Sequence, residues 1–123
     1  MNFEIEKKDN YAVVKVKVEK LDSQISPSLK SELVVLNADE FKNIIIDLED
    51  TRYCDSSGLS AILVANRLCK NAGGSFILCS LQRSVSKLIS ISQLDTILSI
   101  TPTLQEAVDL VAMETIEKDL GEE

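Results

Sequence analysis

The fold is decided by residues 44–59, which read IIIDLEDTRYCDSSGL. Residues 44–48 form a short and almost wholly apolar run, which predicts a strand buried on both faces. Residues 49–54 are mostly polar and predict a loop, and from Leu59 onward apolar residues recur at helical spacing. Residues 55–58 therefore form a small polar corner where the chain leaves a central strand and enters a helix. In open α/β sheets such a corner is the usual place for a functional site.

The segments before this stretch predict a hairpin and one helix. Residues 2–6 and 11–19 both alternate between apolar and polar side chains and are joined by a polar turn. That pattern is typical of an antiparallel hairpin with one face in water. Ser26 and Pro27 are typical of the N-cap and the first position of a helix, which is expected to end at residues 37–40.

The segments after this stretch alternate between helices and strands. Helices are expected at residues 57–70, at residues 83–92 and after Thr103, and strands are expected at residues 75–80 and 95–100. Thr103 and Glu106 have the spacing of a capping box, which predicts the start of the last helix. The complete order predicts a single α/β domain over residues 1–123, with a mixed sheet, an N-terminal antiparallel hairpin and about four helices. The acidic tail from about residue 117 is expected to fray.

The charge of the chain argues against two classes of partner. Twenty Asp and Glu residues against 13 Lys and Arg residues give a formal net charge of −7. Nucleic acids and anionic membranes both require a basic surface, so we expect neither as a partner. The sequence shows no signal peptide and no apolar run of about 18 residues, so we expect a cytoplasmic protein.

The chain lacks the groups on which common enzyme sites depend. It contains no His, so a serine at the corner would have no ordinary general base. It contains no glycine-rich phosphate-binding motif either. Asp47 and Asp55 could bind a divalent ion as a pair, but Asp47 is expected inside the strand and Asp55 is expected to cap the helix. We therefore expect no enzymatic activity, no metal and no cofactor.

The three cysteines are odd in number and include no Cys-x-x-Cys pair. This pattern argues against structural zinc and predicts reduced thiols. Cys69 and Cys79 lie in apolar patterns and are expected to be small buried side chains. For Cys54, which precedes the corner, two interpretations stay open: a structural thiol, or a reactive thiol at a helix N-terminus.

The corner itself also fits two interpretations. As plain structure, Asp55 and its neighbours cap the helix through free backbone N–H groups, and Gly58 lets another backbone approach closely. As a functional site, a serine hydroxyl at an exposed helix start is within reach of a kinase. A phosphate there would add about −1.5 to −2 charges beside Asp55. The helix N-terminus would tolerate that charge in the free domain, whereas a partner docked over the corner would not.

The order of these features resembles the STAS domain, and most closely the bacterial anti-sigma factor antagonists. The resemblance covers nearly the whole chain and rests on the strand at residues 44–48, the motif Asp55-Ser56-Ser57-Gly58-Leu59, residues 71–74 (NAGG) and residues 76–79 (FILC). It implies a mixed sheet with helices mainly over one face. It also implies that Ser56, directly after the Asp of the motif, is the phosphorylated residue. The partner-binding residues that the resemblance implies are Asp22, Asp55, Ser56, Ser57 and Gly58.

The resemblance further implies a regulatory switch. The unphosphorylated form would bind an anti-sigma factor that is also a serine kinase and would so free a sigma factor, and a PP2C-like phosphatase would reset the switch. Lys20 departs from the family, which usually has Gly before the Leu-Asp of this early loop. The alternative is a STAS scaffold that binds a partner in a transporter or a stress-signalling complex without being phosphorylated.

Overall fold

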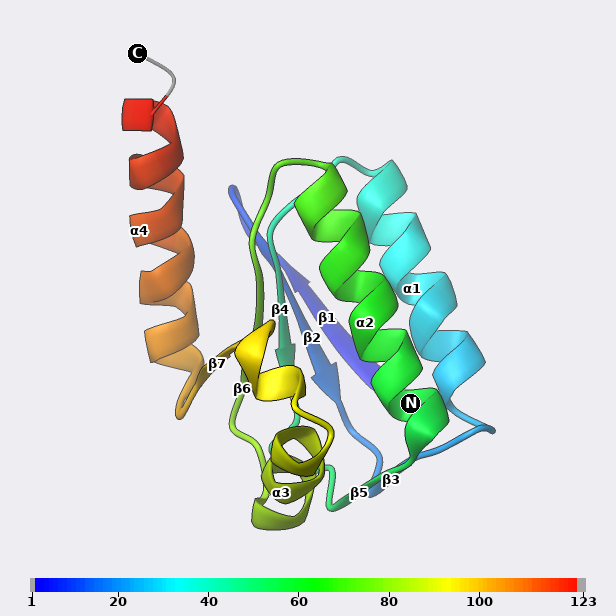
Figure 1. The fold of residues 1–123 in the computed structure, drawn as a ribbon. Coiled ribbons are helices and arrows are strands. Elements are labelled where there is room, and N and C mark those ends of the chain that lie inside the picture. Colours follow the sequence, from blue (N-terminus) through cyan, green and yellow to red (C-terminus); the bar gives the residue numbers. More distant parts are fainter. Residues whose placement is uncertain (1, 122–123) are drawn as a thin grey trace.

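A five-stranded mixed sheet forms the centre of the structure, a computed structural model that describes residues 2–121 (Figure 1). Its strands, in sheet order, are β1 (Phe3–Lys7), β2 (Ala12–Val16), β4 (Ile44–Asp47), β6 (Phe76–Cys79) and β7 (Ser99–Thr101). β1 and β2 form the predicted antiparallel hairpin, and the other neighbours in the sheet are parallel. The predicted mixed sheet is confirmed.

The apolar sequence of β4 is explained by its position in the middle of the sheet. β2 and β6 flank it, and all four of its residues are buried. Side chains alternate between the two faces of a strand, so Ile44 and Ile46 belong to one core cluster and Ile45 to the other. A strand with both faces covered has no position for an exposed polar side chain, which accounts for the unbroken run of isoleucines.

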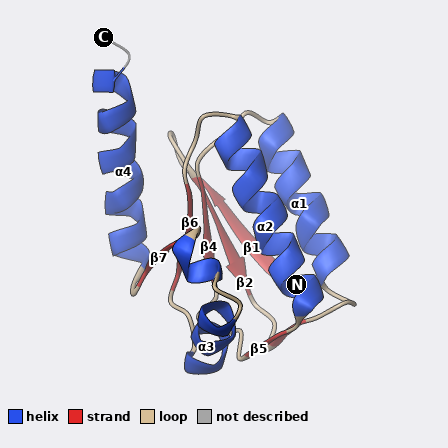
Figure 2. Cartoon of the chain, in the orientation of Figure 1, coloured by secondary structure: helices blue, strands red, loops and turns tan. Residues whose placement is uncertain are grey.

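Of the helices within residues 2–121, three cover one face of the sheet and the last covers the other (Figures 1 and 2). The helices are α1 (Ser26–Ala38), α2 (Ser56–Asn71), α3 (Arg83–Ile91) and α4 (Leu104–Gly121). The larger core lies between the sheet and α1, α2 and α3. On the opposite face, Ala107 and Val111 of α4 pack against Val13, Ile45 and Ile77. Among residues 2–121, no helix combines the length and the apolar character needed to span a membrane.

Two expectations about the strands need correction. The hairpin does not have one continuous wet face, because Val13 is buried beneath α4 and β2 is therefore covered on both sides. The segment at residues 95–100 is not a single strand, since a 3₁₀ turn (Leu94–Thr96) precedes β7.

The last helix extends further than the sequence predicts. α4 is helical to Gly121, whereas fraying is expected from about residue 117; Glu122 and Glu123 lie outside the described residues. The Ser75 hydroxyl donates to Glu114 (2.5 Å), and the Lys118 ammonium lies 3.4 Å from the same hydroxyl. These contacts tie the second half of α4 to the body of the domain.

The core beneath α4 can be tested with two isoleucines that differ in burial. Ile45 is fully buried, whereas Ile116 on α4 is 59% exposed. We expect Ile45→Ala to lower the free energy of unfolding by about 2–5 kcal/mol, because it leaves a cavity between the sheet and α4. Ile116→Ala should change it by less than about 0.5 kcal/mol. Urea denaturation of both variants measures the difference, and equal effects would contradict the assigned core.

Candidate functional site

A small second sheet places the loop that begins at Asp22 beside the corner at residues 55–58. β3 (Lys20–Leu21) and β5 (Tyr53–Cys54) pair in parallel, with Leu21 opposite Cys54. The backbone N–H of Asp55 then donates to the carbonyl of Leu21 (3.3 Å). The loops that follow the two strands, beginning at Asp22 and Asp55, therefore leave the small sheet side by side.

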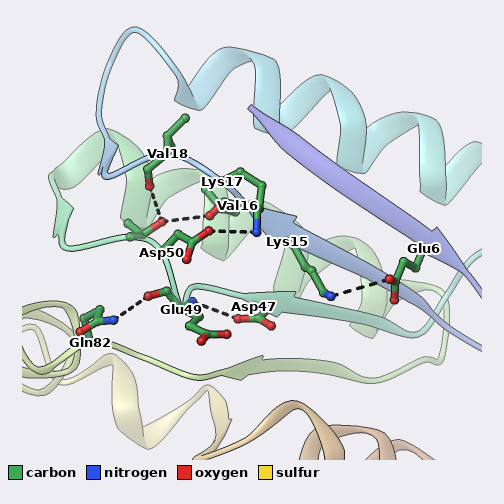
Figure 3. Close-up of polar contacts among 10 residues, drawn as sticks. Glu6, Lys15, Val16, Lys17, Val18, Asp47, Glu49, Asp50 and Gln82 are labelled. Atoms are coloured by element: carbon green, nitrogen blue, oxygen red, sulfur yellow. Dashed lines mark hydrogen bonds and ion pairs between the residues drawn. The ribbon is translucent and has the colours of Figure 1, made fainter. Parts of the chain in front are cut away.

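Polar contacts fix the loop that leads from β4 into the corner (Figure 3). The Thr51 side chain is fully buried, and its hydroxyl donates to the carbonyl of Val18 (2.9 Å). The Gln82 amide donates to the carbonyl of Glu49 (2.6 Å) and so joins the start of α3 to this loop. The loop is thus held from both sides before the chain reaches Ser56.

Gly58 is required where α2 passes the small sheet. A Cβ atom added at Gly58 would lie 2.6 Å from the carbonyl oxygen of Leu21 and 2.6 Å from the Cys54 sulfur. Both distances are far shorter than any van der Waals contact, and one of the two atoms belongs to the backbone. The expectation that Gly58 allows a close backbone approach is confirmed.

Asp55 is the N-cap of α2, as predicted. Its Oδ1 atom accepts hydrogen bonds from the Ser57 hydroxyl (2.5 Å), the Ser57 N–H (2.9 Å) and the Gly58 N–H (3.1 Å). The bond from the Ser57 hydroxyl, followed by that from the Gly58 N–H, holds the pKa of Asp55 below its usual value of 3.8. Asp55 is therefore an ionised carboxylate at neutral pH, immediately beside Ser56.

The two serines of the motif have different environments. The Ser57 hydroxyl is half-buried, bonded to Asp55 and 3.2 Å from the Ser26 hydroxyl. Ser56 is exposed, and its hydroxyl has no hydrogen-bond partner among residues 2–121. Of these two serines, Ser56 therefore presents the free hydroxyl oxygen to an approaching protein.

Ser26 contacts the corner through Ser57, although the sequence predicts that it is the N-cap of α1. It is not the N-cap of α1, since Ile25 holds that position and Ser26 is the first helical residue. Its buried hydroxyl donates to the backbone carbonyl of Asp22 (2.7 Å). Together with the contact to Ser57, this bond links the Asp22 loop to the start of α2. The Ser-Pro pair at residues 26–27 predicts where the helix begins, but it does not predict the contact between Ser26 and Ser57, which are 31 positions apart in the sequence.

The remaining candidate residues have structural roles. Cys54 is only 5% exposed, and burial followed by the nearby charge of Asp55 raises the pKa of its thiol to about 11. The reactive-thiol interpretation of Cys54 is therefore wrong. Asp47 ends β4 and is buried, and its Oδ1 accepts a bond from the Glu49 N–H (2.9 Å). The described residues contain no cluster of three or more His, Cys, Asp or Glu residues that could hold a metal ion.

Comparisons with known proteins agree on one family. The STAS domain model matches residues 2–107. The anti-sigma-B factor antagonist of Bacillus subtilis (strain 168) is 30% identical, over 82% of this chain and 93% of the relative. An anti-sigma factor antagonist from Mycobacterium paratuberculosis has the same fold, with a TM-score of 0.80 at 24% identity over 89% of this chain and 92% of that one. The Bacillus cell fate determinant SpoIIAA in its phosphorylated form aligns with a TM-score of 0.70 at 22% identity over 89% of this chain and 98% of that one.

The close approach at Gly58 predicts a large effect of a single methyl group. We expect Gly58→Ala to destabilise the fold by about 1–3 kcal/mol, because the new Cβ atom must displace the Leu21 carbonyl or the Cys54 side chain. The control is Gly121→Ala on α4, where an added Cβ meets no atom within 4 Å. Urea denaturation would contradict the assignment if both variants unfolded at the wild-type concentration.

The hydrogen bonds to Asp55 predict a pH effect with a definite sign. The carboxyl pKa is lower in the folded state, so the bonds stabilise the fold above pH 3.8, and this contribution is lost as the pH falls through the folded pKa. Ser57→Ala should raise the pKa of Asp55 toward 3.8, since the Ser57 hydroxyl is the largest cause of the shift. Ser56→Ala should leave it unchanged. NMR titration of the carboxyl carbons measures all three proteins, and equal values in the two variants would refute this explanation.

Proposed function

Because the chain belongs to the STAS domain family, we propose that it acts as an anti-sigma factor antagonist whose Ser56 is a phosphorylation switch. Residues 1–123 work as one domain in this proposal, and the domain acts by binding, with no catalysis of its own. The unphosphorylated form binds an anti-sigma factor in the cytoplasm and thereby frees a sigma factor. The relatives named anti-sigma factor antagonists support the first step.

The observation that carries the proposal is the difference between the two adjacent serines. Ser56 offers an exposed hydroxyl with no partner among residues 2–121, and the hydroxyl of Ser57 is bonded to Asp55. A kinase needs a hydroxyl that can enter its active site and lose its proton there. The Ser57 hydroxyl is less available for such a reaction, because it donates its hydrogen bond to Asp55.

The surroundings of Ser56 explain why a phosphate would act as a switch. A phosphoserine adds about −1.5 to −2 charges next to the Asp55 carboxylate. The N–H groups of Ser57 and Gly58 already donate to Asp55, so they do not neutralise the phosphate. In the free domain the new charge faces water, but beneath a docked partner it would be desolvated beside a second negative charge.

Two partners follow from this mechanism. The anti-sigma factor is itself the serine kinase that modifies Ser56, and a PP2C-like phosphatase removes the phosphate. The surface of this chain that contacts the anti-sigma factor includes Asp22, Asp55, Ser56, Ser57 and Gly58. The small sheet and the start of α2 bring these residues to one corner. The phosphorylated form of SpoIIAA, which has the same fold, supports the phosphorylation step by analogy.

Variants of the two serines test the proposal against the host's purified anti-sigma factor kinases. Ser56→Ala should bind the partner kinase but accept no phosphate. Ser56→Asp should bind at least about 30-fold more weakly, because a buried unpaired charge costs on the order of 2–5 kcal/mol and each 1.4 kcal/mol is tenfold in affinity. Ser57→Ala is the matched control and should still be phosphorylated.

Phosphopeptide mapping and binding titrations give the result, and thermal unfolding checks that each variant is folded. Label on Ser57 instead of Ser56, or wild-type affinity in Ser56→Asp, would refute the switch. Binding to a partner with no phosphate on any serine in the host would instead favour the non-phosphorylated scaffold.

A further inference from the structure

Beside Ser56, the small sheet exposes an aromatic residue. Leu21 and Cys54 of β3 and β5 are buried, so their strand neighbours Lys20 and Tyr53 lie on the outer face, opposite each other in the register. The Tyr53 side chain is 52% exposed and is the only exposed aromatic residue among residues 2–121. It precedes Ser56 by three residues.

The helix α3 continues this exposed surface. The Ser84 hydroxyl donates to the carbonyl of Arg52, which places that side of α3 next to β5. Residues three and seven positions further along a helix lie on the same side. Those positions are Lys87 and Ile91, both exposed, and Ile91 is 69% exposed. We call the surface formed by Lys20, Arg52, Tyr53, Lys87 and Ile91 the Tyr53 face.

The Tyr53 face is rich in cations, although the chain carries a net charge of −7 and one of these cations, Arg52, lines a hollow together with Glu19, Glu49 and Asp50. Its three cationic side chains, Lys20, Arg52 and Lys87, take part in none of the ion pairs formed within the described part of the chain. Residues 79–94, which include all of α3, contain no Asp or Glu. Cations without partners around exposed apolar side chains are complementary to an acidic surface on another protein.

The backbone beneath this face is held rigidly. The N–H groups of Arg52 and Tyr53 both donate to the carbonyl of Glu19 (2.9 and 3.0 Å). Gln82 and Ser84 anchor the start of α3 to the same loop (Figure 3 shows the Gln82 bond). A partner would therefore meet the Tyr53 face already in its binding conformation, which lowers the entropy cost of docking.

We propose that the Tyr53 face is a docking surface for the kinase that acts on Ser56, and that it contacts an acidic patch of that kinase with the Tyr53 ring as its anchor. This inference rests on the proposed function. A stable protein interface covers about 800 Å² on each partner, far more than a single helix start, so a kinase that reaches Ser56 must also contact neighbouring surfaces. Tyrosine is among the residues that most often dominate the binding energy of an interface.

The test compares exposed side chains on opposite faces of the sheet, with the purified host kinase that phosphorylates wild-type Ser56 as the probe. We expect Tyr53→Ala to weaken binding at least tenfold. Lys87→Glu should slow association, with an effect that diminishes at high salt. Met113→Ala on α4 is the control, since Met113 is 58% exposed, and it should bind within twofold of wild type. Unchanged thermal unfolding would show that the variants are folded.

The possible outcomes separate a failure of the Tyr53 face from a failure of the proposed function. Wild-type affinity in both Tyr53→Ala and Lys87→Glu, with Ser56 still phosphorylated, would overturn the Tyr53 face and leave the proposed function intact. Absence of binding between the wild-type chain and every anti-sigma factor kinase of the host would overturn both. Self-association of the wild-type chain that Tyr53→Ala abolishes, with kinase binding unchanged, would assign the face to a second copy of the chain and refute the proposal.

Discussion

The close approach between Gly58 and the Leu21 carbonyl is the constraint on which the Ser56 corner depends. Because position 58 has no side chain, the first turn of α2 lies directly against the small sheet. That contact places the Asp22 loop beside the start of α2, where Ser26 and Ser57 can meet. The corner is therefore rigid for reasons of packing, and its polar contacts follow from that packing.

The same geometry places two adjacent serines in different surroundings. Successive residues in a helix are rotated by about 100°, so Ser57 faces Asp55 and α1 whereas Ser56 faces solvent. The hydroxyl of Ser57 helps to hold the carboxylate that caps the helix. Ser56 makes no comparable contact within residues 2–121, so its chemistry is free for another protein to use.

The sequence predicts the features that depend on local pattern. The apolar run at residues 44–48 predicts a buried strand, and the Asp-Ser-Ser-Gly motif predicts the start of α2 with Asp55 as its cap. Features that depend on contacts distant in sequence are not predictable in this way. The pairing of Leu21 with Cys54 involves strands of two residues, too short to show any periodicity. The burial of Val13 depends on α4, which begins about ninety residues later.

The division of the helices between the two faces has a consequence for how the chain folds during synthesis. All strands and the helices α1, α2 and α3 precede α4 in the chain, so one side of the sheet can be covered while α4 is still being made. Until α4 docks, Val13, Ile45 and Ile77 form an apolar strip open to water, in the middle of an otherwise complete sheet. Exposed strips of this kind cause nascent chains to associate. α4 therefore acts as an internal cover, and a chain that ended before Leu104 would keep this strip exposed and would be more prone to aggregate than the complete domain.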